Sequence, residues 1–231
     1  MAGHSASRQI WNSIHQRKPS SQKPEDGVIA FLEHLDARLT PGLPLLDAGC
    51  GRGRNTFYLS QVGFRVYACD LSSVALQVAK VYAEDAGVPV YLQAADLTCL
   101  PYANDQFAAA ICVHVLPYHR KADIIKCLWE LRRVLQPDGW LYLDLLAPED
   151  AEYGCGNKLE EDTFLDQDGT PVHFSSRGEV NELLHGFEME QITRLELTTS
   201  PVRTRVSWAI WAVKHIGEQK KNPSRSETWA M

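Results

Sequence analysis

A run of apolar residues ends in an acid and three alternating glycines between residues 43 and 55. The run LPLLDAGCGRGRN begins as a short buried strand, and Gly49, Gly51 and Gly53 allow the chain to turn sharply beneath a ligand. Dinucleotide sites use a G-x-G-x-x-G spacing and a helix N-terminus that faces a pyrophosphate. Here the spacing differs, and Asp47 stands at the strand tip, where it would repel a phosphate. The motif therefore predicts a nucleoside crevice for a positively charged ligand.

Two further acids follow the next predicted strands. Asp70 stands 19 residues after Gly51, at the end of the second strand, where a carboxylate can accept both hydroxyls of a ribose. Asp96 follows the third strand and can accept from an exocyclic amino group, while Leu97 covers a ring face. Either acid alone is also typical of a turn or a helix cap. The glycine loop before them favours the nucleoside interpretation.

The residues after the fourth predicted strand are candidates for the reacting side of the site. Cys112 and Val113 end that strand and are expected to line the ligand through backbone groups. Cys112 is expected to pack as a small buried residue rather than to act as a nucleophile. His114, then Tyr118 and His119, are candidate general bases. The alternative is that they shape the pocket or cap the following helix, and no metal site is predicted.

The elements that must position these residues alternate along the chain. Apolar spacing, caps and glycine stops predict helices over 26–39, 55–62, 74–86, 122–135 and 176–184. Strands are predicted over 43–47, 64–69, 90–94, 107–113, 140–146, 187–199 and 203–214, with a turn at 137–139. The order predicts an α/β, Rossmann-like sheet of seven mostly parallel strands, with helices on both faces and a C-terminal antiparallel hairpin. Ligands of such sheets bind beyond the carboxyl ends of the strands.

Three segments differ in composition from the single domain predicted over residues 26–214. Residues 1–25 are polar and contain a short predicted helix around Trp11. They are expected to form an arm or a lid in which Trp11 and Arg17 close over the ligand, and a disordered arm is the alternative. Residues 147–172 form an irregular insertion, a second candidate lid, and His173 beyond it is a further pocket candidate. Residues 215–231 form a polar tail that is expected to be disordered.

Composition excludes several classes of protein. The 231 residues are 45% hydrophobic, and no apolar run approaches the ~20 residues that span a bilayer. Six cysteines without a C-x-x-C pair predict reduced thiols and a cytoplasmic location. The formal charge of −6 argues against a general nucleic-acid-binding protein.

This set of motifs resembles the class I S-adenosylmethionine-dependent methyltransferases over about residues 26–214. Residues 47–53 match the family's D-x-G-x-G-x-G loop, Asp70 its ribose acid, and Asp96 with Leu97 its adenine loop. Residues 135–139 look like its L-k-P-G-G turn, and the terminal hairpin looks like its reversed last strand. The stretch CGRGRNTFYLS is similar to small-molecule members, including the tellurite-resistance type. Ala108 and Asp138 depart from the family pattern, both outside the pocket.

The resemblance implies S-adenosylmethionine as cofactor and transfer of its methyl group, by in-line displacement, to a small-molecule acceptor. The implied cofactor-binding residues are Asp47, Ala48, Gly49, Gly51, Asp70, Leu71, Asp96, Leu97, Cys112 and Val113. His114 and Tyr118 are the candidate catalytic residues, although proximity alone can accelerate the transfer. A protein or RNA methyltransferase of the same fold, and a cofactor-binding protein without transfer activity, are the alternatives. The acceptor atom (oxygen, nitrogen, sulfur or metalloid) and the oligomeric state stay open.

Overall fold

A central sheet of seven strands organises the chain. The computed structural model describes residues 2–17, 23–35, 39–200 and 203–215. The sheet consists of β1 (Pro44–Ala48), β2 (Arg65–Asp70), β3 (Val90–Ala94), β4 (Phe107–Cys112), β5 (Leu135–Leu146), β9 (Glu188–Ser200) and β10 (Arg203–Val213). Their spatial order is β3-β2-β1-β4-β5-β10-β9. The first five pair in parallel, whereas β10 runs antiparallel to both β5 and β9. The predicted Rossmann-like sheet with its terminal hairpin is confirmed.

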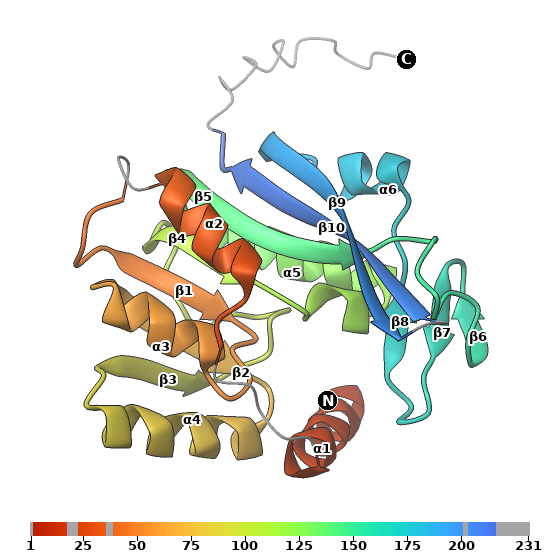
Figure 1. Cartoon of the computed structure of the whole chain (residues 1–231), viewed down its shortest axis with the longest axis horizontal. Coiled ribbons are helices and arrows are strands. Elements are labelled where there is room, and N and C mark those ends of the chain that lie inside the picture. Colours follow the sequence, from red (N-terminus) through yellow and green to blue (C-terminus); the bar gives the residue numbers. More distant parts are fainter. Residues whose placement is uncertain (1, 18–22, 36–38, 201–202, 216–231) are drawn as a thin grey trace, which may run out of the picture.

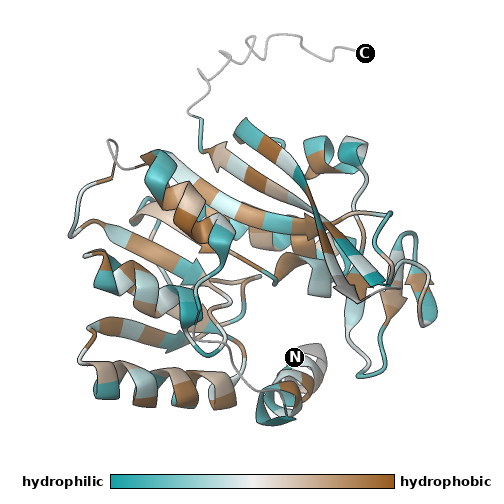
Figure 2. Ribbon diagram, in the orientation of Figure 1, coloured by the Kyte–Doolittle hydropathy of each residue, from teal (hydrophilic) through white to brown (hydrophobic). Residues whose placement is uncertain are grey.

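Helices cover both faces of this sheet because successive residues of a strand point to opposite sides. On β1, Leu45 packs with α2 (Asp26–Leu35) and α3 (Arg54–Gln61). The next residue, Leu46, packs in the other core cluster with α5 (Lys121–Val134) and α6 (Arg177–Leu183). Helix α4 (Ser73–Ala86) lies against α3 and β3. Figure 2 shows hydrophobic and hydrophilic bands alternating along α4, as expected of a helix with one buried face.

The segment before Ser176 differs from the prediction. Three short strands, β6 (Asn157–Glu160), β7 (Thr163–Leu165) and β8 (Pro171–His173), form a separate antiparallel sheet. We name this sheet the insert sheet. Strands of three or four residues are too short to show a period of two, so the sequence predicted only an irregular insertion there.

The prediction of a turn at residues 137–139, before the fifth strand, is wrong. Residues 135–146 are one continuous strand, with a register shift opposite Phe107 and a left-handed φ of 58° at Asp138. The Asp138 N–H donates to the Lys214 carbonyl over 3.1 Å, and the Lys214 N–H donates to the Gly139 carbonyl over 2.9 Å. These bonds to the chain after β10 hold the segment at the sheet, although residues 136–139 interrupt the regular pairing of β5 with β4.

The N-terminal segment contains a longer helix than the sequence predicted. Helix α1 (Ala2–Arg17) extends over 16 residues. It lies beside the carboxyl ends of the parallel strands, and the insert sheet lies near the same edge (Figure 1).

Among the described residues, no helix combines the length and apolarity that crossing a membrane requires. The expected disordered tail lies outside the described residues apart from His215.

Candidate active site

A cavity of about 820 Å³ opens at the carboxyl ends of the parallel strands. Its walls come from the loops after β1, β2, β3 and β4, from α1, and from the insert sheet. The size is within the range of small-molecule and cofactor sites. The predicted site residues that line it are Gly49, Gly51, Asp70, Leu71, Asp96, Leu97, Val113, His114, Tyr118 and His119. The strand ends therefore bring most of the predicted site together.

The glycine loop is held against the end of β2. The N–H groups of Gly49 and Cys50 both donate to the Cys69 carbonyl, over 2.8 and 2.9 Å. Gly49 has a φ of 78°, and a Cβ at this position would lie 2.3 Å from a methyl carbon of Val115. This position therefore requires glycine both for its backbone conformation and for the close approach of the loop after β4.

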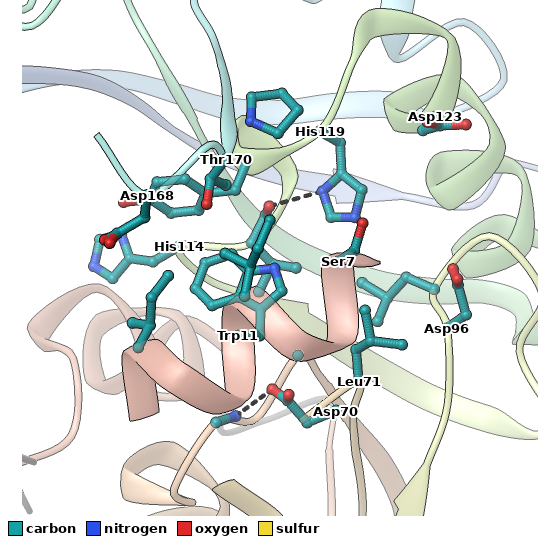
Figure 3. Close-up of a pocket in the computed structure, with 18 of the residues that line it drawn as sticks. Ser7, Trp11, Asp70, Leu71, Asp96, His114, His119, Asp123, Asp168 and Thr170 are labelled. Atoms are coloured by element: carbon teal, nitrogen blue, oxygen red, sulfur yellow. Dashed lines mark hydrogen bonds between the residues drawn. The ribbon is translucent and has the colours of Figure 1, made fainter. Parts of the chain in front are cut away.

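Asp70 joins the glycine loop to the start of α4. Its two carboxylate oxygens accept from the Gly51 N–H at 2.8 Å and the Ser72 N–H at 2.7 Å. Burial raises the pKa of Asp70, although these two backbone bonds favour its charged form. A carboxylate has about four acceptor positions, more than these backbone groups occupy, so Asp70 can still accept from a ligand hydroxyl. Figure 3 shows Asp70 at the cavity wall with its bond to Gly51.

Asp96 and Leu97 line the cavity after β3. Asp96 accepts from the Thr98 N–H at 2.8 Å and from the Thr98 hydroxyl at 2.7 Å, which fixes the carboxylate. Leu71 and Leu97 offer apolar side chains at the same wall. Together, one carboxylate and two leucines form a surface suited to a flat base that carries an amino group.

Three predicted cofactor residues do not line the cavity: Asp47, Ala48 and Cys112. Asp47 is 2% exposed and accepts from the Thr56 hydroxyl at 2.6 Å. Burial raises its pKa to about 7. Because Asp47 lies beneath the glycine loop, it can act on a cation only through that loop. Burial also holds the pKa of Cys112 well above its usual value, which keeps the thiol protonated.

His114, a predicted catalytic residue, lines the cavity and lies between two carboxylates. Asp144 binds it twice, with one oxygen accepting from the His114 N–H at 2.6 Å and the other lying 2.8 Å from Nδ1. On the other side of the ring, a Glu25 oxygen lies 3.6 Å from Nε2. Burial favours the neutral ring, but the two carboxylates outweigh it and raise the pKa of His114 to about 9. An imidazolium has no lone pair, so the protonated form of His114 that these carboxylates favour cannot accept a proton.

Glu25 continues this network to α3. It pairs with Arg54 over 2.8 Å, and its pKa is lowered by its bond to His114 and by Arg54. The sequence indicated neither Glu25 nor Asp144, because no local pattern pairs residues so far apart along the chain.

Two of the other aromatic candidates, Tyr118 and His173, also have defined partners. The Tyr118 hydroxyl accepts from Arg205 over 3.1 Å, and its ring meets Trp11 edge-on with centroids 5.5 Å apart. His173 lies in hydrogen-bond contact with Thr163 at 2.7 Å and with Glu179 at 3.2 Å, and it does not line the cavity. Tyr118 lies at the cavity wall, where its catalytic role stays a prediction, and His173 connects the insert sheet to α6.

Helix α1 is held over the cavity by contacts with three different parts of the chain. The Asn12 side-chain oxygen accepts from the Ser72 hydroxyl over 2.8 Å, at the start of α4. Arg52 of the glycine loop donates to the His15 carbonyl. Arg17 pairs with Asp168 of the β7–β8 turn over 2.8 Å. The helix thus lies over the glycine loop and reaches the insert sheet, which is the position of a lid.

This chain is similar to known proteins both in a segment of its sequence and in its fold. A family model described as a methyltransferase domain matches residues 45–139. The uncharacterized methyltransferase YodH of Bacillus subtilis is 32% identical over 117 residues, which are 50% of this chain and 49% of that protein. A ubiquinone biosynthesis O-methyltransferase of Methylobacterium is 34% identical over 44% of this chain and 40% of its own length. A tRNA N(3)-cytidine methyltransferase of Mus musculus is 25% identical over 65% of this chain and 42% of its own length. The chain spans about half the length, or less, of these curated relatives.

Two solved structures indicate the same architecture. A SAM-dependent methyltransferase from Methanosarcina mazei superposes with a TM-score of 0.70 at 23% identity, covering 79% of this chain and 97% of that one. TehB from Haemophilus influenzae superposes with a TM-score of 0.66 at 14% identity, covering 88% of this chain and 67% of that one. At these identities the likeness is one of fold.

Proposed function

We propose that the protein is a class I S-adenosylmethionine-dependent methyltransferase and that it transfers a methyl group to a small-molecule acceptor. The motifs after the strands, the methyltransferase-domain model that matches residues 45–139 and the fold shared with a SAM-dependent methyltransferase support this proposal. The observation that supports a small acceptor is the cavity itself. Its 820 Å³ are bounded by α1 on one side and by the insert sheet on another. An acceptor that reacts there must fit between these two elements.

The residues present fit this cofactor. Asp70 would accept from ribose hydroxyls, and Asp96 from the amino group of adenine. Leu71 and Leu97 would flank the base, and the loop at Gly49 would lie beside the amino-acid portion. The bound cofactor supplies a methyl group made electrophilic by its sulfonium. The chain's own contribution is to hold the acceptor in line with that group and to exclude water, which is the main requirement for such a displacement.

Helix α1 contributes to both tasks. Trp11 and Ile14 line the cavity from above, so an α1 in place removes water from the reacting groups. Entry of the cofactor and departure of the product require α1 to move, because it bridges the glycine loop and Asp168. Such movements commonly limit turnover.

An RNA acceptor is the second candidate, and its support is the tRNA methyltransferase of Mus musculus. An RNA acceptor would have to present a single splayed base to the enclosed cavity. The cavity wall carries both acids and bases, including Asp123 and Asp166 beside Arg120 and Lys126. A phosphate backbone instead favours a continuous basic surface.

One set of measurements separates these functions. Calorimetry should detect binding of S-adenosylmethionine and of S-adenosylhomocysteine, and no binding of NAD. A metabolite panel and a preparation of total tRNA should then be compared for release of S-adenosylhomocysteine. Release with tRNA alone would overturn the small-molecule proposal. Binding without release on either substrate would leave a cofactor-binding protein.

A further inference from the structure

The backbone of the loop after β4 determines the tautomer of His119. The short helix η1 (Leu116–Tyr118) turns the chain so that His119 Nδ1 lies 3.0 Å from the Val115 carbonyl. A carbonyl only accepts hydrogen bonds, so Nδ1 must carry a proton. When the ring is neutral, its lone pair is then on Nε2.

Nε2 of His119 faces the cavity. The structure gives this atom no hydrogen-bond partner in the part of the chain that it describes, and His119 belongs to the cavity wall. The atom is also not among the buried polar atoms that lack a partner there, which belong to Tyr102, Thr170 and Ser175. In Figure 3 the ring edge opposite Val115 is turned toward Ser7 of α1. Nε2 is therefore an acceptor that is not completely buried, at the cavity wall beneath α1.

The surroundings of His119 keep its ring neutral. Burial lowers the pKa of His119 below its ordinary value of 6.5, and this effect outweighs the carboxylates of Asp96, after β3, and Asp123, on α5. His114, five residues earlier, is bound directly by carboxylates and is an imidazolium at the same pH. Of the two histidines, only His119 has a lone pair to offer.

We propose that Nε2 of His119 accepts the proton of the methyl acceptor, and that the acceptor is therefore a neutral hydroxyl or amine rather than a pre-ionised thiolate or metalloid oxyanion. This inference rests on the proposed methyl transfer and names its substrate class. The acceptor oxygen or nitrogen forms a bond to the methyl carbon while the carbon–sulfur bond breaks and its electron pair stays on sulfur. The acceptor's proton moves to Nε2, which leaves His119 as an imidazolium.

The charge balance of the cavity makes this step feasible. The sulfonium loses its positive charge as His119 gains one, so the net charge of the cavity does not change during the reaction. Burial opposes an imidazolium at His119 in the resting protein, and the Asp96 and Asp123 carboxylates stabilise it once it forms. After the product leaves, the lowered pKa returns the proton to solvent.

The first test observes the two histidines in the full chain without any acceptor. Long-range ¹H–¹⁵N spectra should show His119 as the neutral Nδ1–H tautomer at pH 7 and His114 as an imidazolium. Diethyl pyrocarbonate, which acylates unprotonated accessible imidazoles, should modify His119 at pH 7 at least tenfold faster than His114. An Nε2–H tautomer, or a protonated His119 at pH 7, overturns the proposal.

The second test uses His119→Asn, whose amide can still donate to the Val115 carbonyl but has no acceptor at the Nε2 position. The probe acceptors are a phenol and the thiophenol of the same ring, because the thiophenol is largely ionised at neutral pH. The variant should methylate the phenol, or the first hydroxyl acceptor from the metabolite panel, about 10²–10⁴-fold more slowly. Thiophenol should react at a rate within about threefold of wild type.

A cofactor readout separates this proposal from its premise. The affinity of His119→Asn for S-adenosylmethionine should stay within about threefold of wild type. A tenfold loss would make His119 a cofactor contact and overturn the proton-acceptor role. If wild-type protein bound no S-adenosylmethionine, the methyltransferase proposal would fail, whereas the tautomer of His119 would still be decided by the spectra.

Discussion

The pairing of His114 with Asp144 predicts a specific dependence of stability on pH. Because Asp144 is 4% exposed and binds both the backbone and the ring of His114, the charge of the ring stabilises the fold. The perturbation that we choose is His114→Asn. His114 has a φ of 58°, and asparagine tolerates this left-handed conformation, so the substitution removes the charge without adding backbone strain.

The expected magnitude follows from the pKa of His114. A rise from 6.5 to about 9 corresponds to about 3 kcal/mol of folding free energy. Since 46% of the side chain is exposed, solvent screening reduces this contribution to about 1–2 kcal/mol. The pKa is raised in the folded state, so the contribution is fully present below pH 6.5. It is lost as the pH rises through about 9.

Urea unfolding at pH 6, 7.5, 9 and 10 measures this contribution. The difference in unfolding free energy between wild type and His114→Asn should be largest at pH 6 and close to zero at pH 10. His185→Asn, an exposed histidine after α6, is the matched control and should show no difference at any pH. A His114→Asn difference that stays constant, or that grows as the pH rises, would refute the assignment of an imidazolium.

Three further predictions concern the cofactor side of the site. Asp70→Asn should weaken S-adenosylmethionine binding about 10- to 100-fold in calorimetry, and an unchanged affinity would remove the ribose assignment. Gly49→Ala should lower the free energy of unfolding more than Gly87→Ala does. Both glycines have positive φ, but only at Gly49 would the new Cβ meet a side chain, 2.3 Å away. Gly87→Ala should cost about 1–2 kcal/mol, and equal losses would contradict the steric argument. Arg17→Gln should change the unfolding free energy by less than about 1 kcal/mol, since the ion pair with Asp168 is exposed. It should nevertheless speed cofactor dissociation in stopped-flow measurements, and an unchanged rate would mean that this pair does not hold α1 in place.

Sequence reasoning predicted the part of the site that depends on strand ends. Parallel strands align their carboxyl ends, so any polar residue directly after a strand reaches the same edge of the sheet. This is why Asp70, Asp96 and the residues after β4 could be expected together, and the structure does bring them to one cavity. The same reasoning does not predict which of these residues are buried. Asp47 also lies at the end of a strand, yet it lies beneath the glycine loop and does not line the cavity.

The parts that sequence reasoning missed are those that depend on contacts distant along the chain. The insert sheet consists of strands too short to show a period, and α1 acquires its place from Arg52 and from Asp168, far along the chain. Asp144 was expected only as part of a buried strand, because nothing in its own neighbourhood indicates that it faces His114. Local patterns specify which elements form, whereas these contacts arise only after the sheet has assembled.

The two histidines after β4 show how such contacts change chemistry. His114 and His119 lie in one loop and have the same intrinsic pKa, and the sequence placed His114 first among the candidate bases only because it follows β4 more closely. A carboxylate partner at Nδ1 favours the imidazolium of the first, whereas burial keeps the second neutral and its carbonyl partner places the proton on Nδ1. An imidazolium beside a bound sulfonium would be repelled unless Asp144 and Glu25 offset its charge, which they do. The same carboxylates that withdraw His114 from proton transfer therefore make its presence at a cationic site tolerable, and proton acceptance is left to His119.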